Sequence, residues 1–243
     1  TDIYRPQEGT FEFRKGPLFH NLILADEINR APAKVQSALL EAMEERQISV
    51  GDKSYPLDDL FLVMATQNPI EQEGTYPLPE AQLDRFLLHV QVGYPNAEEE
   101  RSILVLNRNE AKANKRDAFQ PPELLSVASV MQARQEILRL HLAEELEEYI
   151  VNIVLATRNP TPIDSSLEGQ ILYGASPRAS IGIDRAARAR AWLAGRDYVG
   201  PEDIQDVTAD VLRHRLVLSF EAEADGVDAN SVIERILDGV GVP

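Results

Sequence analysis

Cysteine is absent from the 243 residues, which excludes disulfides and Cys-based metal sites. The chain also lacks any apolar run close to the roughly 18 residues that cross a bilayer. Its longest apolar runs, such as Leu60–Ala65, have the length of a strand. The N-terminal residues are polar and contain no apolar signal core. We therefore expect a cytoplasmic protein with no membrane partner.

Positive charge is also scarce. The chain holds 24 Lys and Arg against 40 Asp and Glu, a formal net charge of −16. This balance argues against nucleic-acid binding by the whole surface, although a local basic patch stays compatible with it. The four His show no metal-ligand spacing; they are His20, His89, His141 and His214. The length suits one large domain or two modest ones.

The N-terminal part of the chain alternates between predicted strands and helices. Apolar runs predict buried strands at Leu22–Ala25, Leu60–Thr66 and Leu87–Val92. Apolar residues at helical spacing predict a helix within 31–47, and alternation around a turn predicts a hairpin at 48–57. Strands separated by helices imply a largely parallel sheet, whose ligands lie beyond the carboxyl ends of the strands.

From Asn96 onward the sequence predicts helices. One of them should be capped by Ser176, which a proline follows at the first helical position. The stretch Asn109–Pro122 contains adjacent prolines and predicts a linker. We therefore divide the chain into an α/β domain at 1–108 and a helical domain at 109–243.

Two adjacent carboxylates, Asp26 and Glu27, end the first apolar strand. They could simply begin a turn where the strand meets water. One mechanism uses both acids: the first holds Mg²⁺, often through water, and the second acts as a general base on an attacking water. Asn68, at the end of a neighbouring strand, could hold the same water. The shared position of the three residues at one sheet edge favours this functional interpretation.

Four segments of the chain closely resemble the MoxR family of AAA+ ATPases. They are LILADEINRAP as the Walker B segment, MATQNP as sensor 1, LPEAQLDRF as the segment with the arginine finger, and GASPRA as sensor 2. The match is strongest over 16–94. The resemblance implies an α/β core of the AAA+ P-loop NTPase type, with a parallel sheet that is incomplete here. A small all-α lid follows that core.

The resemblance also implies a role for each matching residue. Asp26 would bind Mg²⁺ and Glu27 would activate water, while Asn68 would be sensor 1. Arg85 would act in trans, in the site of a neighbouring subunit, and Arg178 would touch the phosphates of ATP in its own or a neighbouring subunit.

Each of these residues also has a simpler interpretation. Arg85 could form a local surface pair with the adjacent Asp84, and Arg178 could lie in an exposed first helical turn. Asn68, which precedes a proline, could be a turn residue. Arg30 could pair with Glu27.

Two further segments resemble the helix-2 insert and the pre-sensor-1 hairpin of the family, which face the central pore or a partner in related rings. They are Gly9–Phe19 and the hairpin at 48–57, where Lys53 is a candidate for substrate contact; both could also be plain surface hairpins. A cluster of arginines should pair with the abundant acids, while a nucleic-acid surface is poorly supported; its members are Arg185, Arg188, Arg190 and Arg196.

The phosphate-binding loop of the family, G-x-x-x-x-G-K-S/T, is absent from the chain. In the resembled fold its strand lies between those matching Leu60–Ala65 and Leu87–Val92, so its omission would leave backbone groups in the core without partners. We therefore expect that Thr1 is not the natural start and that the functional prediction concerns a parent protein. The chain alone should bind and hydrolyse ATP weakly.

The resemblance implies an ATP-hydrolysing chaperone that matures or remodels client protein complexes. It also implies a homo-oligomeric ring, usually a hexamer, and often a partner with a von Willebrand factor A domain. Two alternatives stay open: a non-catalytic ring subunit or scaffold, and the ATPase subunit of a magnesium or cobalt chelatase. A DNA-directed motor fits less well because of the acidity of the chain.

Overall fold

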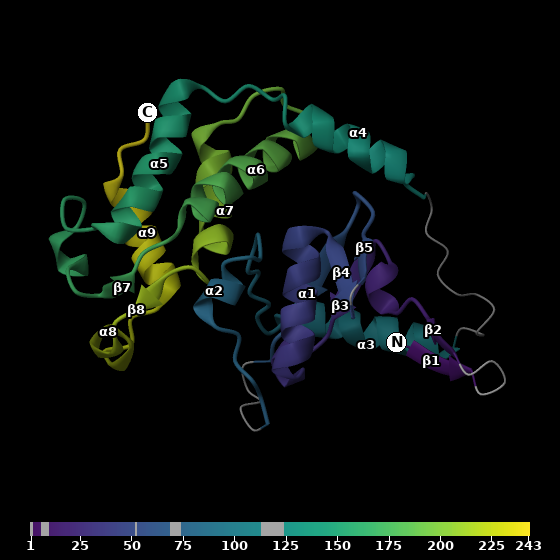
Figure 1. The fold of residues 1–243 in the computed structure, drawn as a ribbon. Helices are drawn as coiled ribbons and strands as arrows, with labels where there is room; N and C mark the ends of the chain where they lie inside the picture. The colour runs from purple at the N-terminus through teal and green to yellow at the C-terminus, as the bar shows by residue number, and fades with distance from the viewer. Residues whose placement is uncertain (1, 6–9, 52, 69–73, 113–123) are drawn as a thin grey trace.

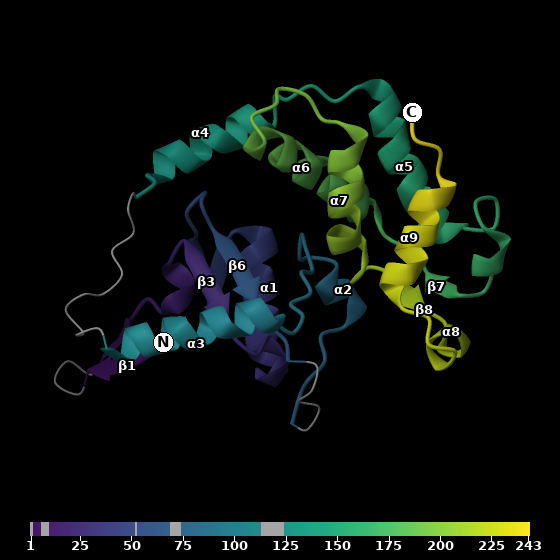
Figure 2. The same ribbon diagram turned by 180° about the vertical axis from the view of Figure 1, so that it is seen from behind.

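The computed structural model describes residues 2–5, 10–51, 53–68, 74–112 and 124–243. An α/β part built from the N-terminal half lies beside a helical part built from the C-terminal half (Figure 1). Helix α2 (Glu80–Leu83) lies between the two parts, also when the molecule is seen from behind (Figure 2). An α/β domain with parallel strands followed by a helical lid is the predicted fold class, which is confirmed.

The strands form pairs. One pair is parallel and consists of β3 (Leu22–Ala25) and β6 (Leu62–Ala65). The antiparallel pairs are β1 (Asp2–Arg5) with β2 (Thr10–Phe13), β4 (Gln47–Val50) with β5 (Lys53–Pro56), and β7 (Ile171–Tyr173) with β8 (Val217–Leu218). The predicted hairpin is therefore confirmed as β4–β5. Its turn residue Gly51 has a φ of 58°, a conformation that favours glycine.

Most of the predicted helices form, and several end where the sequence indicates. The remaining α-helices are α1 (Ala33–Glu45), α3 (Ala97–Lys112), α4 (Val127–Ile137), α5 (Glu144–Arg158), α6 (Pro177–Leu193), α7 (Pro201–Leu212), α8 (Phe220–Ala224) and α9 (Ala229–Gly239). Short 3-10 helices occur at Pro17–Phe19, Ile28–Arg30 and Ser165–Leu167. The Ser176 hydroxyl accepts the Arg178 N–H at the start of α6, which confirms the predicted cap.

The helical part contains the larger core. Helices α5, α6, α7 and α9 contribute side chains that are almost fully buried, among them Tyr149, Ile153, Ile183, Ile204 and Ile233. The α/β part has a smaller core around Ile28, Leu39, Leu40 and Leu78. Among the residues that the structure describes, only one face of the β3–β6 pair packs against this core, which limits its size.

The register of β3 and β6 places their alternate residues on opposite faces. Ile23 and Val63 pack toward the small core. The other face carries Leu22, Leu24, Leu62 and Met64, whose exposed fractions lie between 55% and 66%. One face of these two strands therefore packs against the core, and the apolar side chains of the other face are exposed to solvent.

The predicted strand at Leu87–Val92 is wrong. This segment has no strand partner among the residues that the structure describes. Its backbone bonds to the lid instead: the Leu87 carbonyl accepts from Arg215, and the His89 N–H donates to the Asp210 carbonyl at 2.8 Å. The apolar run predicts a buried strand, yet Val90 and Val92 are exposed.

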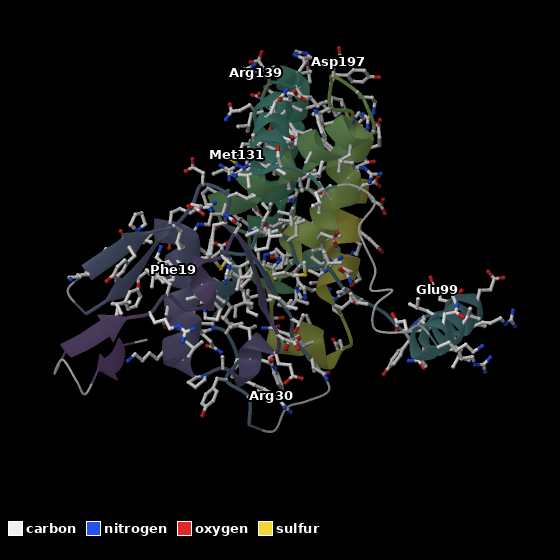
Figure 3. All side chains as sticks on the ribbon, turned by 90° about the vertical axis from the view of Figure 1, so that its right-hand side faces the viewer. Phe19, Arg30, Glu99, Met131, Arg139 and Asp197 are labelled. Carbon is white, nitrogen blue, oxygen red and sulfur yellow. The ribbon has the colours of Figure 1, made fainter. Side chains whose placement is uncertain are left out.

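Helix α3 continues through residue 108, where we placed the end of the first domain, as far as Lys112. The predicted linker therefore begins in helix, and its residues 113–122 lie outside the described residues. Within the described chain α3 has no buried residue, and Figure 3 shows its residue Glu99 apart from the rest of the molecule. None of the helices described here combines the length and apolarity that a membrane span needs.

The two N-terminal hairpins, β1–β2 and β4–β5, meet through aromatic rings. Phe13 stacks on Tyr55 with 4.6 Å between ring centroids, and Phe19 meets both rings edge-on. Stacked and edge-to-face pairs of this kind are favourable beyond the area they bury. The segments that resemble the insert and the pre-sensor hairpin are thus joined to each other.

Candidate functional site

The carboxyl ends of β3 and β6 bring Asp26, Glu27 and Thr66 together. The Thr66 hydroxyl donates to Asp26 Oδ1 at 2.6 Å and accepts the backbone N–H of Glu27 at 2.8 Å. The parallel register explains this contact, because Ala25 and Ala65 are opposite each other and the next residues must meet. One hydroxyl therefore orients the Asp26 carboxylate and holds the backbone of Glu27, a role that the sequence interpretation missed.

Glu27 has a left-handed backbone, with φ 50° and ψ 52°. A non-glycine residue in this region costs of order 1 kcal/mol and persists only where surrounding contacts enforce it. The hydrogen bond from its N–H to Thr66 is one such contact. Glu27 Oε2 lies 3.3 Å from Arg30, whose position Figure 3 marks at the edge of the α/β part. The predicted pair is thus present, and both side chains remain open to solvent.

A buried glutamine fastens the loop that follows Glu27. Gln36, on α1, donates from Nε2 to the carbonyls of Ile28 and Tyr76 at 3.0 Å each. Tyr76 in turn donates its N–H to the Asn29 carbonyl at 2.6 Å. Sequence reasoning missed Gln36, although a polar residue on the otherwise apolar inner face of α1 was the available signal. Asn68 follows β6 by three residues, at the same sheet edge as Asp26, and is partly buried.

The two predicted phosphate-binding arginines share one carboxylate. Arg85 lies 2.8 Å from Glu44 Oε2, and Arg178 lies 2.5 Å from Glu44 Oε1. The three side chains come from different elements: the end of α1, the segment after α2, and the first turn of α6. The structure thus brings Arg85 and Arg178 together although 93 positions of sequence separate them (178 − 85).

Asp84 fixes the backbone around this pair. Its carboxylate accepts the Ser176 hydroxyl at 2.9 Å and Arg215 Nε at 2.9 Å. Arg215 is only 8% exposed and also donates to the carbonyls of Phe86 and Leu87 at 2.6 and 3.2 Å. Burial lowers the pKa of Arg215 from its ordinary value, and the hydrogen bond to Asp84 opposes that shift. The residue next to Arg85 thereby joins the α/β part to the lid.

His214 lies beside this junction, and its Nε2 is 3.0 Å from the Phe86 carbonyl. Burial, followed by the charge of Arg215, lowers the pKa of His214 to about 4. The unfolded state therefore binds a proton near pH 6.5 that the folded state accepts only near pH 4. The free energy of unfolding should fall as the pH drops through this window.

We expect His214→Gln to remove part of this pH dependence. Between pH 7 and pH 5 the wild-type chain should lose about 2 kcal/mol of stability through this residue, and the variant should not. Chemical denaturation at several pH values measures the difference. His20→Gln, a change at an exposed histidine, is the control. Equal slopes for the wild type and His214→Gln would contradict the assignment.

The arginine cluster on α6 and in the loop after it pairs with acids, as predicted, for most of its members. Arg188 meets Asp184 at 2.7 Å, Arg196 meets the buried Asp203 at 2.6 Å, and Arg190 meets Asp206. The pairs of Arg190 and Arg196 hold α6 and the loop after it to α7, whereas the pair of Arg188 with Asp184 lies within α6. They favour a structural role for the cluster over a nucleic-acid surface.

The acidic edge fits magnesium by its donor chemistry. Mg²⁺ prefers oxygen ligands and keeps several waters, so one or two carboxylates and the substrate phosphates usually suffice. Asp26, held by Thr66 and open to solvent, is such a ligand. Among the described residues no group of three or more metal-binding side chains occurs, and Mg²⁺ bound through water needs none.

Comparison with known proteins agrees with this geometry. Residues 1–88 match the family described as "ATPase family associated with various cellular activities (AAA)", and residues 164–236 match its "AAA lid domain". A solved structure of a putative ATPase from Cytophaga hutchinsonii superposes with a TM-score of 0.90 at 49% identity. It covers the whole of this chain, which spans 72% of that one.

Two curated relatives extend the match over almost the whole chain. Chaperone MoxR1 of Mycobacterium tuberculosis is 47% identical over 247 residues, which include all of this chain and 63% of the relative. The uncharacterized protein YeaC of Bacillus subtilis is 42% identical over 99% of this chain and 71% of the relative. The chain thus spans 63% and 71% of the lengths of these two relatives.

The parallel strands, the acids at their carboxyl ends and the helical lid together define an AAA-type ATPase module. Within that class, the chain belongs to the MoxR family of AAA+ ATPases.

Proposed function

We propose that the protein hydrolyses ATP and uses the energy to remodel or mature client protein complexes. The main observation in favour of ATP hydrolysis is that the Thr66 hydroxyl fixes the Asp26 carboxylate and the backbone of Glu27 next to each other. Membership of an ATPase family and a relative named as a chaperone support the proposal. The remodelling step rests on that relative alone.

In this proposal Glu27 takes a proton from the attacking water, and its exposed carboxylate is accessible for that purpose. Asp26 would hold Mg²⁺, which when bound would offset charge on the phosphates. Asn68 orients the attacking water from the end of the neighbouring strand. Arg85 and Arg178 stabilise negative charge on the phosphoryl group as it transfers.

We place Arg85 in the site of a second copy of the chain, within a homo-oligomeric ring that is a hexamer by analogy with the family. The partial exposure of Arg85 supports delivery in trans, because a side chain that pairs with Glu44 at the surface is accessible to a neighbouring copy. A partner with a von Willebrand factor A domain, a cytoplasmic location and the domain division at 108 and 109 stay predictions.

The first test is ATP hydrolysis by the full-length gene product. We expect phosphate release that depends on Mg²⁺ and is lost when the ion is chelated. The 243-residue chain taken alone should turn over ATP weakly, because its sequence contains no phosphate-binding loop. Phosphate release is measured for both proteins under the same conditions. Robust Mg²⁺-dependent turnover by the chain alone would contradict the expectation, and an inactive full-length protein would favour the scaffold alternative.

A further inference from the structure

The Glu44 carboxylate lies between the two arginines and contacts both of them. Each carboxylate oxygen takes one guanidinium, Oε2 that of Arg85 at 2.8 Å and Oε1 that of Arg178 at 2.5 Å. Guanidinium groups bind carboxylates and phosphates through the same planar set of donors. A ligand that satisfies both arginines at once is therefore an anion with at least two oxygens.

The Glu44 carboxylate can be replaced at the two arginines by another anion. The side chains of Arg85, Arg178 and Glu44 are 34%, 44% and 36% exposed. Ion pairs this open to solvent are weak and are screened by salt, so a more highly charged anion can replace the carboxylate.

The frame behind the arginines does not depend on Glu44. Asp84, which precedes Arg85, accepts the hydroxyl of Ser176, which caps the helix that carries Arg178. The buried Arg215 holds the same Asp84 carboxylate. One acid thus fixes both backbone segments, so the two arginines stay neighbours when Glu44 leaves.

We infer that Glu44 is an intramolecular stand-in for phosphate. It holds Arg85 and Arg178 together in the separate chain and is displaced by the terminal phosphates of a nucleotide bound to a second copy. The identity of the nucleotide rests on the proposed function. The exchange of a carboxylate for a phosphate anion rests only on the contacts of these three side chains.

Inorganic pyrophosphate is the probe for this exchange. Calorimetric titration of the 243-residue chain at low salt should show weak binding. Glu44→Gln should tighten it roughly three- to tenfold, because two exposed ion pairs no longer compete with the probe. Glu41→Gln is the matched control: it removes the same charge from the same helix, one turn away, where Glu41 accepts a hydrogen bond from Ser49 at 2.7 Å.

A further variant locates the effect. In the Glu44→Gln background, Arg85→Gln with Arg178→Gln should abolish the gain. The inference is overturned if Glu44→Gln binds pyrophosphate no tighter than the wild type, or if Glu41→Gln gives an equal gain. ATP hydrolysis by the full-length gene product is measured separately. Its absence alongside a tighter Glu44→Gln chain would remove the proposed function and leave the anion site standing.

Discussion

The Glu27→Gln variant of the full-length gene product should lose ATP hydrolysis by a factor of about 100 to 10,000, the contribution typical of a positioned general base. Gln keeps the shape of the side chain and cannot accept a proton from water. The hydrogen bond between the Glu27 N–H and Thr66 involves the backbone, so the local fold should persist. Phosphate release at saturating ATP measures the loss.

ATP binding should survive this change, because Asp26 and the arginines are untouched. A fluorescent nucleotide analogue titrated into the variant tests this expectation. Glu45→Gln, at an exposed position near the end of α1, is the matched control and should keep wild-type turnover. Turnover by Glu27→Gln within about threefold of the wild type would remove Glu27 as the base, since a real base supplies far more.

The second large effect concerns Arg215, the buried cation between the α/β part and the lid. Replacing one partner of a buried ion pair leaves the other charge uncompensated, at a typical cost of about 3–5 kcal/mol. Arg215→Met keeps the aliphatic stem but removes the buried cation from Asp84, which keeps only the Ser176 hydroxyl and a 4.0 Å contact with Arg178. The carbonyls of Phe86 and Leu87 also lose a donor. We expect a melting temperature lower by about 10 °C for a chain of this size.

Thermal unfolding followed by circular dichroism checks this value. Arg185→Met on α6, where the side chain is exposed, makes the same chemical change and should shift the melting temperature by about 1 °C at most. If Arg215→Met had the same melting temperature as the wild type, the Asp84–Arg215 contact would contribute no more than a weak surface pair. This result would contradict the claim that Asp84 and Arg215 fix the backbone segments that carry Arg85 and Arg178.

Local chemistry explains which features could be predicted from the sequence. The Ser176 cap depends on residues two positions apart, and the turn at Gly51 on one backbone conformation, so both were predictable. The parallel edge that joins Asp26 to β6 followed from apolar runs separated by a helix. In each case the pattern lies within one element or between consecutive ones.

The contacts that sequence reasoning missed join distant parts of the chain. Glu44 and Arg178 are 134 positions apart, and Asp84 and Arg215 are 131 positions apart. No periodicity or spacing indicates such partners, because their meeting depends on how the lid packs. The predicted strand at Leu87–Val92 failed for a related reason: an apolar run does not reveal whether its backbone will bond to a strand or to a buried arginine.

The acids and the arginines are carried by separate elements of the chain. Asp26 and Glu27 lie at the sheet edge, whereas Arg85 and Arg178 meet at Glu44 beside the lid. We therefore expect the acids of one copy to work with Arg85 of another copy. A ring that divides its site between copies can be tested by mixing two inactive variants.

The most direct measurement is ATP hydrolysis by an equal mixture of Glu27→Gln and Arg85→Gln full-length proteins that are allowed to assemble together. Each variant alone should be inactive. In the mixture about a quarter of the interfaces would pair an intact Glu27 with an intact Arg85, so activity should recover to about that share of the wild type. A mixture no more active than its separate components would contradict delivery of Arg85 in trans.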